Sequence, residues 1–295
     1  MKFAGIIAEY DPFHNGHAWQ LAQAKALGAE RVAVAMSCSL VQRGALPLLP
    51  EAVRTRSALT CGADLVFALP APCACAGAEA FARAGVALLA AAGCDGLVFG
   101  AETPDAALLM EAAELLDSGS YRAALKAQLA GGARSFAAAR QAAAAKLASD
   151  ERVAALLDKP NNNLAVEYCR AIRSLAPRME AYPLPRQGAN HGEALHSAHG
   201  QFASASALRK LWAEGGADAV APYVPEAVFP LYQEAYAAGQ YTDFSAAGRC
   251  ELALLRSACR GKAPFADIRG ISEGLEHRLE AAVRTSTTYD KLLDA

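Results

Sequence analysis

The sequence lacks several features that mark particular classes of protein. Its eight cysteines include no Cys-x-x-Cys pair, which excludes a zinc ribbon. Its longest clean apolar stretch, residues 84–94, is too short to span a bilayer. The apolar run Phe3–Ala8 stops at Glu9 and has no cleavage site of the kind that ends a signal peptide. These absences predict a reduced, cytoplasmic protein without a membrane partner, whose cysteines are mostly small buried residues.

A surplus of charge of one sign is lacking as well. The 28 Lys and Arg residues nearly balance the 30 Asp and Glu residues, which gives a net charge of −2. Non-specific affinity for nucleic acids depends on positive charge, so an RNA partner would have to be held by a local patch. Hydrophobic residues make up 54% of the 295 residues and charged residues only 20%, which excludes a disordered chain.

Short apolar runs alternate with helical patterns over the first third of the chain. Four of these runs are expected to be strands: Phe3–Ala8, Arg31–Met36, Leu65–Leu69 and Gly96–Phe99. Helices are expected between them, near residues 16–28, 50–61 and 78–92. Short, continuously apolar strands that are separated by helices are typical of a parallel sheet with both faces covered. The sequence therefore predicts an α/β fold with a Rossmann-like parallel sheet.

The rest of the chain is expected to be mainly helical. An alanine-rich stretch over residues 105–176 has a nearly continuous helical pattern, and residues 179–184 are expected to add one more strand. A loop should follow this strand, and more helices should occupy residues 204–293. Neither an internal repeat nor a long linker marks a boundary, so we expect a soft one between a first domain, 1–176, and a mainly helical second part, 177–295.

The most informative residues follow the first expected strand and lead into the first expected helix: Asp11-Pro12-Phe13-His14-Asn15-Gly16-His17. Ligands of open α/β sheets bind at the carboxyl ends of strands, where a helix N-terminus offers N–H groups to phosphate. His14 and His17 lie on one side of the first turn, and Gly16 lets the backbone approach a ligand. The motif predicts a triphosphate site, and the alternative is a capped turn with two surface imidazoles.

A second motif, Ser204-Ala205-Ser206-Ala207-Leu208-Arg209, opens a later expected helix. Serine hydroxyls and N-terminal N–H groups bind phosphate oxygens, and Arg209 can contact them with its planar guanidinium. An ordinary helix N-cap is the alternative. The occurrence of both motifs in one α/β pattern favours nucleotide binding.

These motifs resemble those of the nucleotidyltransferase superfamily with the HxGH signature, in which a Ser-Ser-Thr-x-x-Arg-like motif comes later in the chain. Further blocks are similar to the bacterial tRNA(Met) cytidine acetate ligase family and occur in order over nearly the whole chain. These blocks are Gly5–Tyr10, Val41–Gly44, Gly62–Val66, Phe99–Glu102, Asn161–Leu164 with Glu167-Tyr168, and Glu273–Glu276.

The resemblance implies an enzyme that activates acetate with ATP, accompanied by Mg²⁺, and releases pyrophosphate. The acetyl group of the acetyl-adenylate would then pass to N4 of the wobble cytidine of elongator tRNA(Met). Without the resemblance, the residues themselves are also compatible with two other functions. One is an adenylyltransferase that makes a dinucleotide cofactor, and the other is a nucleotide-binding or RNA-binding protein without turnover.

Carried over by position, the resemblance implies catalytic roles for His14 and His17, which would stabilise charge on the phosphates. The expected ATP site comprises Ile7, Ala8, Glu9, Tyr10, Asp11, Pro12, Phe13, His14, Asn15, Gly16, His17, Ala18, Trp19, Gln20, Gly100, Asn161, Arg186, Ser204, Ser206 and Arg209. Other interpretations exist for three of these residues: a strand-ending turn for Gly100, a helix cap for Asn161 and a solvated charge for Arg186.

The sequence departs from the family pattern at Asp11, at Cys38, at residues 45–47 and after Ala295. Asp11 stands where Asn is usual. Its carboxylate would repel the phosphates unless it coordinates Mg²⁺ or accepts hydrogen bonds from N–H groups. Cys38 replaces a usual Gly and residues 45–47 replace a Glu-Pro-Ala-like run, so the loop around Arg43 is expected to be shaped differently. The family normally continues beyond the position of Ala295 with a basic segment, so we expect normal ATP binding and weak tRNA binding.

Other candidate sites are weaker. Four residues, His191, Glu193, His196 and His199, have the composition of a metal site, but their Gly, Asn and Ser neighbours favour a loop near the substrate, and we assign no metal ligands. The Cys73-Ala74-Cys75 segment is expected to serve packing.

The arginines of the first domain are expected to be ordinary surface residues, among them Arg31, Arg54 and Arg56. Arg43 is the exception, because it follows the second expected strand at the ligand edge of the sheet. It is expected either to contact phosphate or RNA or to form a structural ion pair.

Overall fold

The computed structural model describes residues 1–42, 44–132, 135–185, 195–197, 200–261, 265, 268, 271 and 274–295. Over these residues the chain forms two units, Met1–Tyr241 and Thr242–Ala295, called here the first and the second unit.

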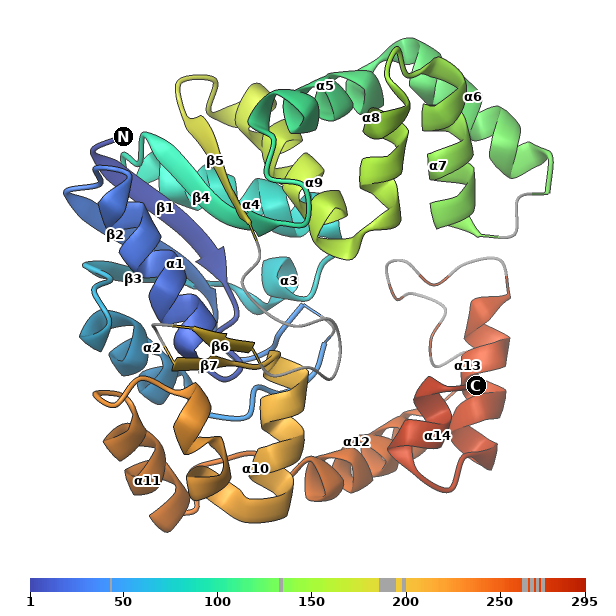
Figure 1. The fold of residues 1–295 in the computed structure, drawn as a ribbon. Coiled ribbons are helices and arrows are strands. Elements are labelled where there is room, and N and C mark those ends of the chain that lie inside the picture. Colours follow the sequence, from blue (N-terminus) through green and yellow to red (C-terminus); the bar gives the residue numbers. More distant parts are fainter. Residues whose placement is uncertain are drawn as a thin grey trace. The chain divides into compact units, whose positions relative to one another are not determined.

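The first unit is built on five parallel strands in the order β3-β2-β1-β4-β5 (Figure 1). The strands are β1 (Phe3–Ala8), β2 (Arg31–Ser37), β3 (Leu65–Leu69), β4 (Gly96–Ala101) and β5 (Glu180–Pro185). They occupy the five runs expected from the sequence, so the predicted Rossmann-like parallel sheet is confirmed. The strand order reverses between β1 and β4, and ligands of such sheets bind at the carboxyl ends of the strands beside this reversal.

Successive side chains of the central strands enter two cores, one on each face of the sheet. Ala33 and Leu97 belong to the core under one set of helices, while Ile6, Val34 and Val98 belong to the opposite core. The first core is covered by α4 (Ala78–Ala91), α5 (Ala106–Asp117) and α9 (Pro160–Leu175). The second is covered by α1 (Asn15–Ala26), α2 (Glu51–Thr60), α10 (Ala205–Val220) and α11 (Phe229–Ala237).

The alanine-rich stretch is helical as predicted, and polar caps divide it. Its helices besides α5 and α9 are α6 (Gly119–Ala130), α7 (Phe136–Leu147), α8 (Glu151–Ala155) and the 3-10 helix Leu156–Asp158. Ser118, Ser135 and Asp150 each accept a hydrogen bond from a backbone N–H of the helix that follows. Alanine favours helix at every position, so these caps determine where each helix begins.

A buried carboxylate joins three of these helices. Glu167 of α9 is only 2% exposed and forms ion pairs with Arg140 of α7 and Arg170 of α9. Arg170 Nε also donates to Asp117 at the end of α5, at 2.8 Å. The pairing leaves the buried charge of Glu167 compensated on two sides, which is the condition for a stable charge in the interior.

Two features of the first unit differ from expectation. Within the segment expected to be a loop, β6 (Leu195–Ser197) and β7 (Gly200–Phe202) form a short antiparallel hairpin. The boundary expected after residue 176 lies inside the first unit, because β5 pairs with β4 along its whole length. The first unit also contains the short helix α3 (Ala71–Ala74) and the 3-10 helix Ala221–Tyr223.

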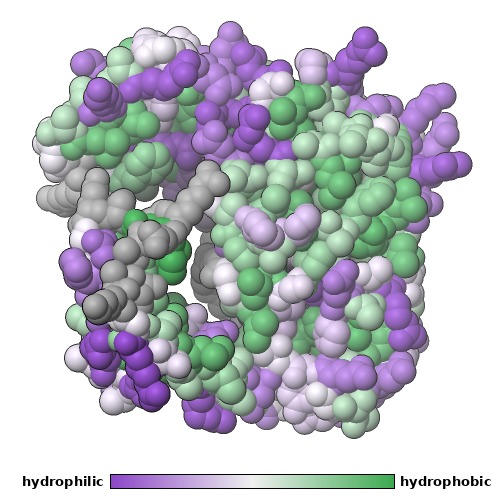
Figure 2. Space-filling view, turned by 180° about the vertical axis from the view of Figure 1, so that it is seen from behind, coloured by the Kyte–Doolittle hydropathy of each residue, from purple (hydrophilic) through white to green (hydrophobic). Residues whose placement is uncertain are grey.

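The second unit contains α12 (Phe244–Ala258), α13 (Leu275–Thr285) and α14 (Tyr289–Leu293). Its small core includes Leu252, Cys259, Phe265, Val283 and Leu292. In neither unit do the described residues contain a helix long and apolar enough to cross a membrane. On the face seen in Figure 2, hydrophobic residues form a broad area in the right half, and hydrophilic residues gather at its margins.

Candidate functional site

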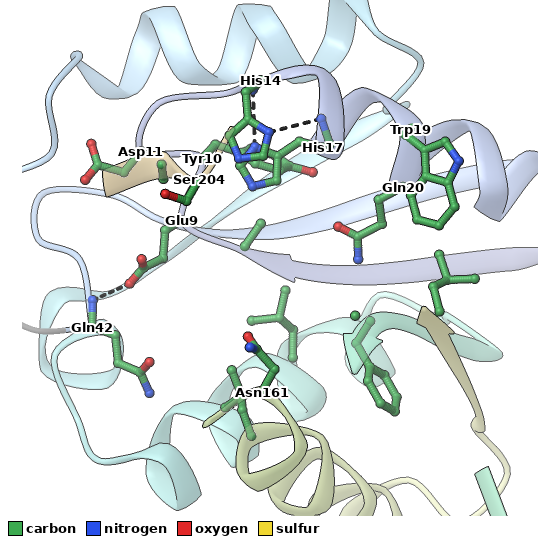
Figure 3. A pocket seen from close by; sticks show the side chains of 18 of the residues that line it. Glu9, Tyr10, Asp11, His14, His17, Trp19, Gln20, Gln42, Asn161 and Ser204 are labelled. Carbon is green, nitrogen blue, oxygen red and sulfur yellow. Dashed lines mark hydrogen bonds between the residues drawn. The ribbon is translucent and has the colours of Figure 1, made fainter. Parts of the chain in front are cut away.

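A cavity of about 410 Å³ lies at the carboxyl ends of the central strands (Figure 3). Its lining includes thirteen of the residues that the sequence assigned to a nucleotide site: Ile7, Ala8, Glu9, Tyr10, Asp11, His14, Gly16, His17, Trp19, Gln20, Gly100, Asn161 and Ser204. The volume is within the range of small-molecule sites. Segments far apart in the sequence therefore meet where an α/β sheet normally holds its ligand.

The two histidines form a reciprocal cap at the start of α1. Nδ1 of His14 accepts a hydrogen bond from Gly16 N at 3.0 Å, and Nδ1 of His17 accepts one from His14 N at 3.3 Å. The imidazole rings are stacked with their centroids 3.7 Å apart. Because both Nδ1 atoms act as acceptors, each neutral ring carries its proton on Nε2. The cap thus fixes the tautomer in which Nε2 is a hydrogen-bond donor.

Gly16 is required by this arrangement. A Cβ atom at residue 16 would lie 2.9 Å from His14 Cε1 and 3.0 Å from His14 Nδ1. A larger residue would therefore displace the imidazole from its capping position. This contact gives a structural reason for glycine between the two histidines.

The rest of the histidine motif supports the loop from behind. Phe13 is fully buried and, together with Tyr10, packs against the His17 ring at centroid distances of 5.6 and 4.8 Å. Asn15 Nδ2 donates to Pro222 O at 3.2 Å. Of the expected site residues in this segment, Pro12, Phe13, Asn15 and Ala18 do not line the cavity.

Asp11 accepts a hydrogen bond from a backbone N–H group and forms an ion pair with an arginine. Its Oδ1 accepts a hydrogen bond from Leu48 N at 2.6 Å, and Arg209 Nη1 lies 3.1 Å from Oδ2. Arg209 Nη1 also donates to the Asp11 backbone oxygen at 2.7 Å. Burial raises the pKa of Asp11, while the bonds from Leu48 and Arg209 act in the opposite direction. Arg209 thereby connects α10 to the loop after β1, and its side chain is outside the cavity lining.

Ser204 is the N-cap of α10 and accepts a hydrogen bond from Ala207 N at 3.2 Å. Its hydroxyl also lies 3.0 Å from that of Ser206, which does not line the cavity. Ala203 and Ala205 line the cavity beside Ser204. The N-termini of α1 and α10 therefore both lie at the cavity, each with backbone N–H groups and partial positive charge.

The interpretation of Arg54 as a surface residue is wrong. Its side chain is fully buried and donates from Nη1 to the backbone oxygens of Glu9 and Ser37, at 2.7 Å each, and from Nε to Leu49 O at 3.0 Å. A further contact joins Nη2 to Cys38 O. Burial lowers the pKa of Arg54, and neighbouring carboxylates oppose that shift. Arg54 thus ties the ends of β1 and β2 together beneath the cavity.

Several lining residues were not assigned from the sequence. Gln42 donates its backbone N–H to the Glu9 carboxylate at 2.5 Å, and Figure 3 shows the two side by side. An apolar wall consists of Phe81, Phe99, Leu164, Tyr168, Leu184 and Pro185. The spacing of Asn161, Leu164 and Tyr168 along α9 is the signal that could have found part of it, because these positions share one helix face.

Two expected site residues, Arg43 and Arg186, lie outside the described residues. The same holds for His191, Glu193 and His199 of the weak metal hypothesis. Within the described part of the chain, no group of three or more His, Cys, Asp or Glu residues is arranged to hold a metal ion. All eight cysteines are free, so the Cys73-Ala74-Cys75 segment contains no disulfide.

Comparison with known proteins gives consistent matches over the whole chain. The model of the HIGH nucleotidyl transferase family matches residues 1–295. The tRNA(Met) cytidine acetate ligase of Syntrophotalea carbinolica is 37% identical over 298 residues, which cover 100% of this chain and 70% of that protein. The protein of the same name from Acetivibrio thermocellus is 33% identical, with 100% and 72% coverage.

Solved structures agree with this comparison. Apo TmcAL from Thermotoga maritima superposes with a TM-score of 0.91 at 30% identity, over 100% of this chain and 70% of that one. TmcAL bound with alpha-thio ATP gives a TM-score of 0.88 at 29% identity, with the same coverage. On this agreement in sequence and fold, the chain belongs to the HIGH nucleotidyl transferase family and, within it, to the tRNA(Met) cytidine acetate ligases.

Proposed function

We propose that this chain is an ATP-dependent ligase that acetylates N4 of the wobble cytidine of elongator tRNA(Met). The observation that carries the proposal is the reciprocal cap of His14 and His17 at a cavity of about 410 Å³. Relatives that are 33–37% identical are named tRNA(Met) cytidine acetate ligase, and a similar structure was solved with alpha-thio ATP. The reaction takes place in the cytoplasm, where its tRNA substrate is found.

ATP binds with its phosphates between the N-termini of α1 and α10. Residues from the starts of both helices line the cavity, where the positive ends of the helix dipoles favour phosphate, and Ser204 adds a hydroxyl. The base and ribose then extend toward Gly100 and Asn161, at the ends of β4 and at the start of α9. Arg209 acts on the phosphates through the loop that it holds by its bonds to Asp11.

His14 and His17 stabilise the charge that develops on the phosphates. With Nδ1 accepting from the backbone, Nε2 is the nitrogen through which each neutral ring would donate to a phosphate oxygen. These donors are held in place before the substrate arrives, so little reorganisation is needed when charge moves onto the leaving pyrophosphate. Loss of one such donor typically lowers turnover by about 10²–10³.

The chemistry requires no nucleophile from the protein. An acetate oxygen attacks the α-phosphorus, the bond to the β-phosphate oxygen breaks, and pyrophosphate leaves with the negative charge. In the second step N4 of the cytidine attacks the acetyl carbon, AMP leaves, and N4 loses a proton. The protein supplies position and charge neutralisation, which are the main sources of acceleration for displacement at phosphorus.

The residues at the cavity fit a Mg²⁺ ion that enters with the nucleotide. Glu9 and Asp11 are the carboxylates in the lining, and each already accepts a backbone hydrogen bond. Asp11 is also paired with Arg209. Mg²⁺ in nucleotide sites takes phosphate oxygens and water with one or two carboxylates, so the triphosphate would supply most of its ligands.

The test is an assay of the purified chain with ATP, acetate and elongator tRNA(Met). We expect pyrophosphate release with ATP and acetate alone, and acetylcytidine in the tRNA when all three are present. A dinucleotide product from ATP and a mononucleotide phosphate would identify a cofactor-synthesising adenylyltransferase. Nucleotide binding without any product would contradict the proposal in favour of a binding protein.

Two variants separate catalysis by His17 from its capping role. In His17→Asn, the Asn oxygen can still accept the hydrogen bond from His14 N, but no Nε2–H remains. We expect this variant to retain its thermal stability and to lose turnover by about 10²–10³. His17→Ala should lose turnover to the same degree and, in addition, about 1 kcal/mol of stability. Full turnover in His17→Asn would show that His17 only caps α1.

A further inference from the structure

Glu102, at the end of β4, holds the first residues of α9 at the cavity. Its Oε1 accepts a hydrogen bond from Asn161 Nδ2 at 2.6 Å and a longer one from Asn161 N at 3.3 Å. Its Oε2 accepts one from Asn162 N at 2.7 Å. The N-cap residue of α9, Lys159, provides no side-chain bond, so Glu102 satisfies the N–H groups that a capping side chain normally takes.

Asn162 fixes the same junction from the other side. Its Oδ1 accepts from Thr103 N at 2.9 Å, and its Nδ2 donates to Thr103 Oγ1 at 3.1 Å. Only 1% of Asn162 is exposed, so these bonds are shielded from water. Thr103 is therefore hydrogen-bonded to α9, and this fixes the position of the Glu102 carboxylate relative to Asn161.

This geometry determines which end of the Asn161 amide faces the cavity. Burial raises the pKa of Glu102, but the hydrogen bonds from Asn161 and Asn162 outweigh it, so the pKa is lowered overall and the group is ionised at neutral pH. An ionised carboxylate only accepts hydrogen bonds, so the NH₂ of Asn161 has to point at it. Figure 3 shows the Asn161 side chain directed from the start of α9 into the cavity. The carbonyl oxygen is thus the end that Asn161 offers to a ligand.

The side chains that follow Asn161 on its face of α9 are apolar. Leu164 and Tyr168 follow Asn161 on the same face of α9, and Phe99 packs against Tyr168 at a centroid distance of 5.4 Å. All of them line the cavity. Such a wall suits the flat surface of a nucleobase, and an acceptor beside it is stable only when the ligand supplies a donor.

We infer that Glu102 is a positioning residue that fixes the Asn161 carbonyl oxygen as an acceptor for the exocyclic amine of the nucleotide base. The inference rests on the proposed function in that the ligand is a nucleoside triphosphate. It makes the Glu102–Asn161 pair the source of selectivity for adenine over purines that lack the amine. A ribose hydroxyl is the other donor that a nucleotide could offer to this oxygen, and the experiment below distinguishes the two.

The experiment compares dissociation constants of four triphosphates for the full chain, in the absence of acetate and tRNA. ATP is measured against purine riboside triphosphate, which lacks the amine, and against inosine triphosphate, which has an oxygen in its place. The fourth is 3′-deoxy-ATP, which lacks a ribose donor. We expect ATP to bind roughly tenfold more tightly than either base analogue, because purine riboside offers the carbonyl no donor at that position and inosine places an oxygen against it.

Two variants of Glu102 test the positioning role. In Glu102→Gln, one side-chain atom can still accept from Asn162 N, while the new NH₂ donates to Asn161 Oδ1 and turns the amide around. We expect inosine triphosphate then to bind at least as tightly as ATP. In Glu102→Ala the Asn161 amide is no longer held in one orientation. ATP, inosine triphosphate and purine riboside triphosphate should then bind within about twofold of one another. The matched control is Asp105→Ala, which removes the cap of α5 from Leu108 N without touching a cavity residue and should leave all ratios unchanged.

The possible outcomes are distinct. An equal loss of affinity for all nucleotides in both Glu102 variants would overturn the inference, because a purely structural cap acts on every ligand alike. A tenfold loss with 3′-deoxy-ATP and none with the base analogues would also overturn it and assign the acceptor to the ribose. Failure of the unaltered chain to bind any of the triphosphates would instead contradict the proposed function. Retained binding with altered ratios in Glu102→Gln is the result that supports the inference.

Discussion

At the scale of single residues, the position of His14 depends on the absence of a side chain at Gly16. The imidazole occupies the space that a Cβ would need, with Cε1 2.9 Å from the ideal Cβ position. The same imidazole accepts the hydrogen bond from Gly16 N, so ring and backbone are fixed together. The direction in which Nε2 of His14 points is consequently determined by backbone geometry, and under the proposed function a change at residue 16 should act on chemistry more than on stability.

The first prediction follows from this contact. Gly16→Ala should move the His14 ring and lower turnover with ATP and acetate by at least tenfold, because the donor would no longer meet the developing charge. The midpoint of thermal unfolding should change little, because the helix preference of alanine over glycine offsets the loss of the hydrogen bond from Gly16 N to His14. The control is Gly119→Ala in α6, where a Cβ meets nothing within 4 Å and normal turnover is expected. Normal turnover in Gly16→Ala would contradict the steric account of the motif.

At the scale of secondary structure elements, Arg54 of α2 acts as a link between strand ends. It donates to the backbone oxygens of Glu9, Ser37 and Leu49, which belong to three different segments around the cavity. The carbonyls of Glu9 and Ser37 are at the ends of β1 and β2, where the ladder no longer supplies partners, and that of Leu49 lies just before α2. The guanidinium of Arg54 therefore donates to buried backbone carbonyls that have no neighbouring strand to bond with.

Replacement of Arg54 should destabilise the protein strongly. Arg54→Met fills a similar volume but leaves several buried carbonyls without donors, so we expect a loss of about 3 kcal/mol or more in the free energy of unfolding. Denaturant unfolding measures it. Arg56→Met, two residues along the same helix, is the control: Arg56 is exposed, and its ion pair, at 3.6 Å, is with the exposed Glu234 carboxylate, so less than about 0.5 kcal/mol should be lost. Equal effects of the two variants would show that Arg54 contributes no more than a surface residue.

The turn before β3 carries a pH-dependent contribution. Asp64 Oδ2 accepts from Lys25 Nζ at 2.8 Å and from Val32 N at 2.7 Å, and the bond from Lys25 is the main cause that lowers the pKa of Asp64. A carboxyl with a lowered pKa stabilises the fold above its unfolded pKa of about 3.9, and this stability is lost as the pH falls through the folded pKa. The group is partly exposed, so its contribution is discounted to less than about 1 kcal/mol.

Asp64→Asn should therefore be less stable than the unaltered chain at pH 7, by up to about 1 kcal/mol. The difference should shrink below about pH 4, where the carboxylate of the unaltered chain takes up its proton. Denaturant unfolding at a series of pH values measures this convergence. A constant difference at all pH values would attribute the effect to the hydrogen bond to Val32 N alone.

The elements that the sequence predicts well are those with a local signal. The runs that became β1 to β5 are continuously apolar, and the serine and aspartate caps at 118, 135 and 150 mark helix starts within the alanine-rich stretch. The burial of Arg54 is not predictable in this way, because its partners are backbone oxygens from segments distant in the sequence. The clue in the sequence of its helix is indirect: Val53, Ser57 and Ala58, beside Arg54 or one turn from it, are apolar or small residues, which suit a buried helix face. The β6–β7 hairpin has strands of three residues, too short for periodicity to reveal.

At the scale of the whole molecule, the chain forms one large unit and one small unit. The described residues that line the cavity all belong to the first unit, which also contains both large cores. The second unit has a small core of its own. The late boundary at Tyr241 could not be predicted from composition, because the segment from β5 to α11 is completed only by long-range packing on the sheet.

This division predicts where nucleotide binding acts. A ligand at 100 times its dissociation constant adds about 2.7 kcal/mol to the free energy of every local opening that disrupts its binding site. Openings elsewhere in the protein are not affected. Saturation with a non-hydrolysable ATP analogue should therefore slow hydrogen exchange in peptides from β1, α1 and the start of α10, which line the cavity. Peptides from α12 to α14 of the second unit should exchange at unchanged rates. Equal protection of α12 to α14 would show that the second unit takes part in holding the nucleotide, and it would contradict a site confined to the carboxyl edge of the sheet.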